Sequence, residues 1–128
     1  MSDDLLDTGK RLRAEVIGQA RHDAAMANAT AFDLPFQDLA LRYCWGEIWG
    51  RPGLDRRARS ILNLGMLIAL GKATELKIHV RGALTNGVTR EELQEILLQA
   101  CIYCGVPAAS EAFRAAKEVL AELDAAGG

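Results

Sequence analysis

The amino-acid sequence predicts an all-α fold, a compact helical domain of about six or seven helices. Alternation of apolar and polar residues at a period of two, which marks a half-buried strand, is almost absent. Alanine and leucine, which favour helices, dominate the chain instead. At 128 residues the chain is long enough to bury one core, so we expect a single domain over residues 1–128.

Capping residues and helix breakers place the helices in order. Pro35 fits the first turn of a helix, Asp55 can cap another, and Thr89 with Glu92 forms a capping box. Three glycines each follow a helical run and can end it: Gly71, Gly87 and Gly105. The expected helices cover residues 2–18, 22–31, 35–48, 55–70, 72–86, 89–104 and 107–125.

The helix expected at residues 55–70 has an unusual surface. Between residues 61 and 70 it offers no continuous polar face. A helix that is apolar all round has to be buried on every side. A chain of this length has little material to cover it, so we expect a homo-oligomer.

The charge and composition of the chain indicate which partners it can bind and in which compartment it works. The net charge is about −2, which gives no bulk attraction to nucleic acid or to an anionic membrane. The acidic N-terminus lacks the apolar run of a signal peptide, and the apolar stretch at 61–70 is too short to span a bilayer. The odd count of three cysteines favours reduced thiols. Together these features predict a cytoplasmic location.

Four arginines surround the start of the most apolar helix, close to its expected N-cap, Asp55. A helix N-terminus already carries partial positive charge, so cations there do not favour the helix. They are explained if an anion is held there by backbone N–H groups and guanidinium forks. The alternative is that Asp55 caps the helix and the arginines are simply solvated. The four residues are Arg51, Arg56, Arg57 and Arg59.

The helix expected at residues 72–86 carries a candidate acid–base pair. Glu75 and His79 are four residues apart and therefore share a face, and Asn86 falls on the same stripe. An imidazole beside a carboxylate can exchange protons near neutral pH. The alternative is an exposed pair that only supports the helix. Lys77 and Arg81 point the opposite way, where we expect them to be solvated.

The aromatic residues allow two interpretations. Trp45 and Trp49 are four residues apart and precede the arginines. They either pack in the core or form a flat wall against a planar ring. Tyr103 is a candidate to lend a hydroxyl to a bound molecule, although a buried tyrosine with a local partner is the more ordinary reading.

Cys101 and Cys104 form a C-x-x-C pair that resembles a redox motif. Such a pair gains reactivity when its first sulfur lies at a helix N-terminus. Here both fall near the C-terminal end of a helix, so we interpret them as small core or interface residues. With no second ligand pair, the sequence predicts no metal site.

Several strings of residues, taken together, resemble the carboxymuconolactone decarboxylase family. The Trp-Gly-x-Ile-Trp-x-Arg-Pro-Gly string is the most specific, whereas the Glu-x-x-x-His helix is shared with a wider superfamily that includes alkylhydroperoxidase-like proteins. The resemblance extends over nearly the whole chain. The matching strings are residues 45–54, 57–61, 75–79, 86–90 and 102–109.

The resemblance implies an all-helical, cyclic homo-oligomer, a trimer or a hexamer, that works without a cofactor. It implies conversion of 4-carboxymuconolactone, a dicarboxylate lactone, to the enol-lactone of 3-oxoadipate and carbon dioxide in protocatechuate catabolism. For this reaction the resemblance implies that His79 is the general acid and that Glu75 orients the imidazole of His79. Arg51 and Arg57 become the residues that recognise carboxylates, and Trp45 the apolar wall.

Two features depart from relatives of this kind. Lys72 and Glu75 stand where the alkylhydroperoxidase-like branch carries the cysteines of Cys-x-x-Cys-x-x-x-His, while His79 remains. Tyr43 stands where histidine is expected in some decarboxylases. A thiol-dependent peroxidase or disulfide reductase using Cys101 and Cys104 is the alternative activity, and a non-catalytic protein that binds a small anion is a third.

Overall fold

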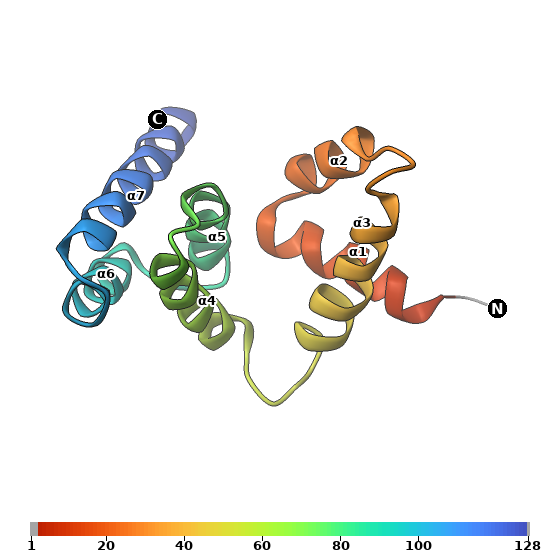
Figure 1. Ribbon diagram of the computed structural model, residues 1–128, viewed down its shortest axis with the longest axis horizontal. Coiled ribbons are helices and arrows are strands. Elements are labelled where there is room, and N and C mark those ends of the chain that lie inside the picture. The colour runs from red at the N-terminus through yellow and green to blue at the C-terminus, as the bar shows by residue number, and fades with distance from the viewer. Residues whose placement is uncertain (1–2, 128) are drawn as a thin grey trace. The chain divides into compact units, whose positions relative to one another are not determined.

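The computed structural model describes residues 3–127, which form seven α-helices, one π-helical segment and no strand (Figure 1). The all-α prediction is confirmed. The elements are α1 (Asp4–Ile17), α2 (Gln19–Asn28), α3 (Leu34–Leu39), η1 (Ala40–Ile48), α4 (Arg56–Leu70), α5 (Ala73–Thr85), α6 (Arg90–Cys104) and α7 (Val106–Gly127). The chain divides after Arg56 into two compact units, each described by itself below. The single domain over residues 1–128 stays a prediction.

In the first unit, α1 lies directly against η1 because two glycines remove the side chains between them. A Cβ placed on Gly9 would lie 1.8 Å from the carbonyl oxygen of Leu41. A Cβ on Gly46 would lie 2.5 Å from the carbonyl oxygen of Leu5. Only glycine therefore permits this approach of the two backbones.

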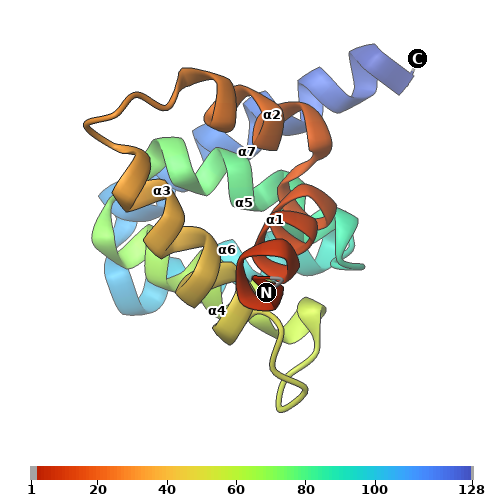
Figure 2. The ribbon, with the colours of Figure 1, turned by 90° about the vertical axis from the view of Figure 1, so that its right-hand side faces the viewer.

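The helix expected over residues 35–48 has the right extent, but its second half is not α-helical. The helix continues without a break from α3 into η1 (Figure 2). In η1 the backbone hydrogen bonds span five residues, as from the Trp49 N–H to the Cys44 oxygen over 3.0 Å. An apolar pattern over so few turns does not separate the two helix types, so the sequence could not reveal the change.

The prediction of a second helix at residues 22–31 is wrong by three residues, because α2 covers Gln19–Asn28. Gly18 adopts φ +100°, which lets α2 begin at once after α1. At the other end, the Thr30 N–H donates to Oδ1 of Asp33 over 2.6 Å, and this local turn replaces a further helical turn. The first residue of the expected 2–18 helix lies outside the described residues.

A buried arginine joins the first three helices. The Nε of Arg13 on α1 donates to Nδ1 of His22 on α2, and its Nη1 donates to Oε1 of Gln37 on α3, both over 2.9 Å. Arg13 and His22 are 6% and 7% exposed. Two of the three guanidinium nitrogens thus donate to neutral acceptors within this unit, which ties the three helices to one another, while Nη2 is buried without a hydrogen-bond partner.

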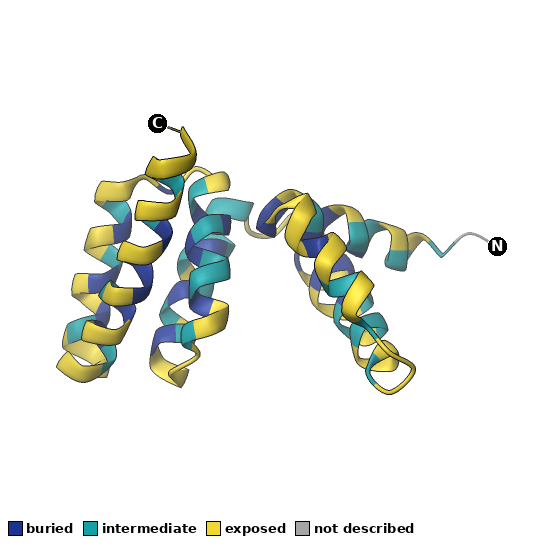
Figure 3. Ribbon diagram, turned by 90° about the horizontal axis from the view of Figure 1, so that it is seen from above, coloured by how far each residue is buried: buried dark blue, intermediate teal, exposed yellow. Residues whose placement is uncertain are grey.

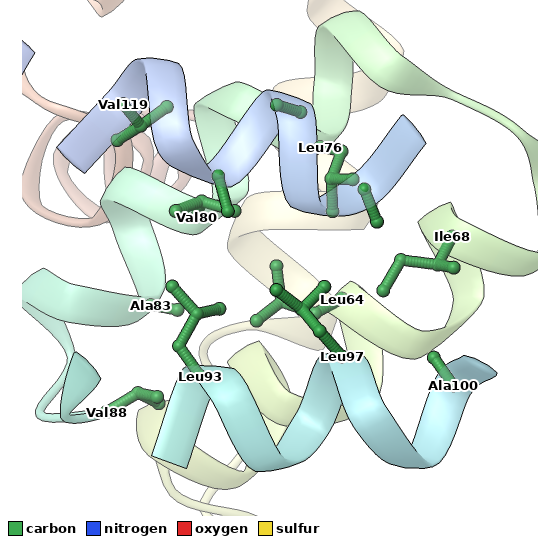
Figure 4. Packing of buried hydrophobic residues seen from close by; sticks show 13 residues of the cluster. Leu64, Ile68, Leu76, Val80, Ala83, Val88, Leu93, Leu97, Ala100 and Val119 are labelled. Carbon is green, nitrogen blue, oxygen red and sulfur yellow. The ribbon is translucent and has the colours of Figure 1, made fainter. Parts of the chain in front are cut away.

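The second unit is built on one apolar core between α4, α5, α6 and α7 (Figure 4). Leu64, Val80, Leu93 and Leu97 are almost completely buried in it. A leucine or valine buried this fully contributes about 1.5–3 kcal/mol relative to an exposed position. The small residues of α7 allow it to lie close to its neighbours: Ala109, Ala112, Ala115 and Ala116.

The boundary signals of the second unit were interpreted correctly, with small shifts at the ends. The capping box of Thr89 and Glu92 is present in front of α6. Gly71, Gly87 and Gly105 all adopt positive φ at helix ends. The last helix is longer than the expected 107–125, since α7 covers Val106–Gly127.

Two cations of α5 are not merely solvated, which corrects the expectation for them. Lys77 pairs with Glu118 of α7, and Arg81 donates to Glu122 of α7 over 2.8 Å. Contacts between half-exposed charges contribute little stability, but they line the outer edge of the α5–α7 contact.

Within the single chain α4 is covered on one side only, and the expectation that other subunits cover the rest is not tested by it. Leu64 and Ile68 face the core, whereas Leu62, Met66 and Leu70 are 53%, 47% and 68% exposed. As Figure 3 shows, helices of the chain carry buried residues along one side and exposed residues along the other. The homo-oligomer stays a prediction. Within residues 3–127, no helix is long and apolar enough to cross a membrane.

Candidate active site

The apolar face of α5 fixes where Glu75 and His79 point. Leu76, Val80 and Ala83 recur at helical spacing and belong to the core. This face sets the rotation of the helix about its axis. It leaves Glu75 exposed and His79 half-buried at the edge of the core. The two residues share one side of α5, as the sequence predicted.

The surroundings of His79 favour its neutral form. Burial lowers the pKa of His79, and the negative charge of Glu75 raises it only in part, so the pKa lies below its ordinary value. At neutral pH the free protein therefore holds mostly the uncharged imidazole. A negatively charged molecule bound nearby would raise the pKa of His79 and load it with a proton.

Asn86 does not extend the stripe of Glu75 and His79, because α5 ends at Thr85 and Asn86 is its C-cap. Its Nδ2 donates to Oγ of Ser60 over 2.9 Å, which joins the end of α5 to the second turn of α4. Ser60 is 1% exposed. The sequence does not predict this contact, and its one signal there is a lone hydroxyl at the border of the apolar run.

Arg57, near the start of α4, contacts the first turn of α6 and passes near Gly87 in the turn before it. Its Nη2 donates to Oε2 of Glu92 in a close ion pair. Its Cδ lies 4.0 Å from where a Cβ on Gly87 would be. Glu92 was interpreted from the sequence only as part of the capping box, so its contact with Arg57 is new.

Two other arginines of the cluster, Arg51 and Arg56, also contact carboxylates. Arg51 donates to Glu47 over 3.2 Å, and Arg56 donates to Glu15 over 2.6 Å, both within the first unit. Arg51, Arg56 and Arg57 are therefore each paired with a carboxylate of the protein and are not simply solvated cations. Any anion that binds to these guanidinium groups shares them with carboxylates of the protein.

The two tryptophans pack together in the first unit. Trp45 and Trp49 are 6% and 8% exposed, and their ring centroids lie 5.0 Å apart with planes inclined by 25°. Of the two arrangements that the sequence allows, core packing or a wall against a ligand, this is core packing. A substrate-facing role for Trp45 stays a prediction, as does the role of Arg51 in the same unit.

Tyr103 lies at an exposed position of α6. With Ile61, Gly65 and Cys104 it lines a groove of about 260 Å³ between α4 and α6. Neither His79 nor Arg57 lines this groove. A contribution of the Tyr103 hydroxyl to a site on α5 stays a prediction.

The cysteines are all free thiols. Cys101 is half-buried and Cys104 is exposed, near the C-terminal end of α6. Neither is a fully buried core residue. No group of three or more His, Cys, Asp or Glu side chains that could hold a metal ion occurs in the described part of the chain.

A comparison with known proteins decides the family. The model of the carboxymuconolactone decarboxylase family matches residues 35–118, from α3 into α7. The chain belongs to this family. The family predicted from the sequence strings is thereby confirmed.

Two curated relatives match nearly the whole chain. It is 40% identical over 115 residues to a 4-carboxymuconolactone decarboxylase of Acinetobacter baylyi, covering 90% of this chain and 86% of that protein. It is 41% identical over 119 residues to a nitrosuccinic acid decarboxylase of Metarhizium robertsii, covering 93% and 83%. The prediction of an enzyme of the carboxy-lyase class is confirmed.

Proposed function

We propose that this protein removes carbon dioxide from 4-carboxymuconolactone and releases the enol-lactone of 3-oxoadipate. The observation that carries the proposal is the 40% identity to a decarboxylase of that name over nine-tenths of this chain. The half-buried His79 beside Glu75, in the same unit as Arg57, supplies groups for the chemistry. We place the reaction in protocatechuate catabolism in the cytoplasm.

The substrate itself can accept the electrons that decarboxylation leaves behind. Its departing carboxylate sits on a ring carbon joined through a double bond to the lactone carbonyl. The electron pair of the broken C–C bond spreads onto that carbonyl as a dienolate, so the chemistry needs no cofactor. The protein has to bind the remaining carboxylate, stabilise the developing oxyanion and protonate the ring carbon next to the carbonyl.

His79 is our proton donor for that carbon. In the free protein burial holds its pKa below the ordinary value, so the imidazole is mostly neutral. The arrival of a doubly negative substrate favours the imidazolium and draws a proton to the site. Glu75, whose charge raises the pKa of His79, assists this protonation. Binding thus prepares the donor that the dienolate needs.

Arg57 and Arg51 are our candidates for recognising the two carboxylates of the substrate. Both guanidinium groups are substantially exposed, although Glu92 and Glu47 share them. Guanidinium forks suit the geometry of a carboxylate. Trp45 would supply the apolar wall around the leaving carboxylate, and Tyr103 a further hydroxyl. We also propose a homotrimer or homohexamer, which would cover the exposed apolar side of α4.

A second substrate has support from a specific observation. The nitrosuccinic acid decarboxylase is as similar to this chain as the lactone enzyme is. Nitrosuccinic acid is likewise a dicarboxylic acid, and its nitro group can accept the electron pair left by decarboxylation. Both candidate substrates are dianions that the protein would bind through their carboxylates. They differ in the group that accepts the electron pair, which is a lactone carbonyl in one and a nitro group in the other.

The test is a direct comparison of the two substrates. Freshly generated 4-carboxymuconolactone and nitrosuccinic acid are offered separately, and substrate loss and carbon dioxide release are followed. We expect a higher kcat/KM for the lactone, and a higher value for nitrosuccinic acid would overturn the proposal. Cys104→Ala should leave decarboxylation nearly intact, whereas the thiol-dependent alternative requires that it abolish peroxide consumption.

A further inference from the structure

We propose that Glu92 is a positioning residue that holds the guanidinium of Arg57 in place for a substrate carboxylate. The inference rests on the proposed role of Arg57 in carboxylate recognition. It assigns to Glu92 a task beyond the capping box in which it takes part.

The carboxylate of Glu92 uses its two oxygens on two different partners. Oε1 accepts the backbone N–H of Thr89 over 3.0 Å, and Oε2 accepts Nη2 of Arg57. The backbone N–H of Glu92 in turn donates to Oγ1 of Thr89 over 3.0 Å. The Glu92 carboxylate is therefore held at Oε1 by the Thr89 backbone, and through Oε2 this restraint passes to Arg57.

Arg57 is held at its head. Its stem passes near Gly87, where an added Cβ would lie 4.0 Å from Cδ of Arg57, an ordinary contact distance. Its head ends on Glu92 through one nitrogen, Nη2. A guanidinium carries five N–H donors in a planar fork, so the contact with Glu92 leaves others to face an anion.

The pair stands where orientation matters more than stability. Both side chains are about two-fifths exposed, and an ion pair at such an exposure adds little to folding. A negative charge beside Arg57 also weakens its long-range attraction for a dianion. The gain is that a guanidinium already held in one rotamer loses less freedom when the substrate binds.

The experiment separates the two contacts of Glu92 with matched variants. Glu92→Gln keeps an oxygen for the Thr89 N–H, since glutamine also serves in a capping box, but turns an amide toward Arg57. Thr89→Ala removes half of the box and leaves the ion pair. We expect Glu92→Gln to raise KM about 3- to 30-fold with kcat within about 3-fold. Thr89→Ala should lower Tm and leave KM unchanged.

A second variant set and a second readout keep the inference separate from the proposed function. In an Arg57→Ala background, Glu92→Gln should change KM no further, because the two residues act through one contact. In NMR spectra, the Arg57 Nη protons should be resolved in wild type and in Thr89→Ala, and averaged by rotation in Glu92→Gln.

The outcomes are distinct. Unchanged KM in Glu92→Gln, with KM raised by Arg57→Ala, overturns the inference and leaves the function standing. No turnover of the lactone by wild type overturns the function, and the Arg57 signals then decide the inference alone. Identical Arg57 signals in wild type and Glu92→Gln overturn the inference whatever the activity.

Discussion

The Nε of Arg13 donates a hydrogen bond to Nδ1 of His22, 2.9 Å away, and this contact exists only while Nδ1 carries no proton. Both side chains are buried, Lys10 adds positive charge nearby, and Asp23 opposes it. Burial and the charge of Arg13 lower the pKa of His22. Protonation would place a second buried cation against the guanidinium.

Stability of the first unit should therefore fall at acid pH. Because the folded pKa of His22 lies below the unfolded value of 6.5, the unfolded state binds more protons between the two values. The contribution of neutral His22 to the free energy of unfolding is complete above pH 6.5 and is lost as the pH falls through the pKa of His22 in the folded state. Urea unfolding followed by tryptophan fluorescence reports this unit, since Trp45 and Trp49 both lie in it.

The matched variant for this prediction is His22→Gln, whose oxygen accepts from Arg13 without titrating. We expect it to weaken the pH dependence while His22→Ala lowers the free energy of unfolding by about 1–3 kcal/mol at pH 8. Equal pH dependence in wild type and His22→Gln would show that another group is responsible.

Gly9→Ala should destabilise the first unit strongly. The added Cβ would lie 1.8 Å from the Leu41 carbonyl oxygen, so α1 and η1 would have to separate. We expect a loss of about 1–3 kcal/mol or more. Gly65→Ala is the control, because Gly65 lies inside α4 and a Cβ added there meets no atom within 4 Å. This substitution should raise the free energy of unfolding by about 0.5–1 kcal/mol. Thermal unfolding of both variants tests this, and similar effects would contradict it.

His79→Ala should lower turnover about 10²–10⁴-fold while the fold survives. The pH dependence has a definite sign. Because burial lowers the pKa of His79, the protonated donor disappears early, and kcat/KM should fall as pH rises through that lowered pKa. Steady-state kinetics from pH 5 to 9, with circular dichroism of the variant, measure both effects. A rate that rises over this range would assign His79 a different role.

Arg57→Ala should raise KM for the lactone, because a substrate carboxylate loses the paired N–H donors of the guanidinium. Arg57→Lys should restore binding only in part, since an ammonium group offers a point charge and no planar pair of donors. Initial rates over a range of lactone concentrations give KM for the three enzymes. Equal KM values in all of them would remove Arg57 from the site.

The sequence predicted the second unit more accurately than the first. Its helices carry clear signals, such as the Thr89 box and the glycines that end α4, α5 and α6. In the first unit, α2 begins early because Gly18 adopts φ +100°, and the π-helix begins beside the close approach of Gly9 to Leu41. The pattern of apolar residues indicates neither feature, so the sequence did not predict them.

The site was predictable only along a single helix. Spacing placed Glu75 and His79 on one face of α5, where the structure has them. The partners of Arg57 and Asn86 lie 35 and 26 residues away, at Glu92 and Ser60. Nothing in the local sequence pairs those residues, because the pairing follows from how α4 and α6 pack around the core.

The central claim is that this chain decarboxylates the lactone with His79 as the source of the proton. The most direct measurement follows freshly generated 4-carboxymuconolactone by NMR with wild type and with a folded His79→Ala variant. The account predicts release of carbon dioxide and formation of the enol-lactone by wild type, with both nearly abolished in the variant. Undiminished formation of the enol-lactone by the variant, or none by wild type, would contradict it.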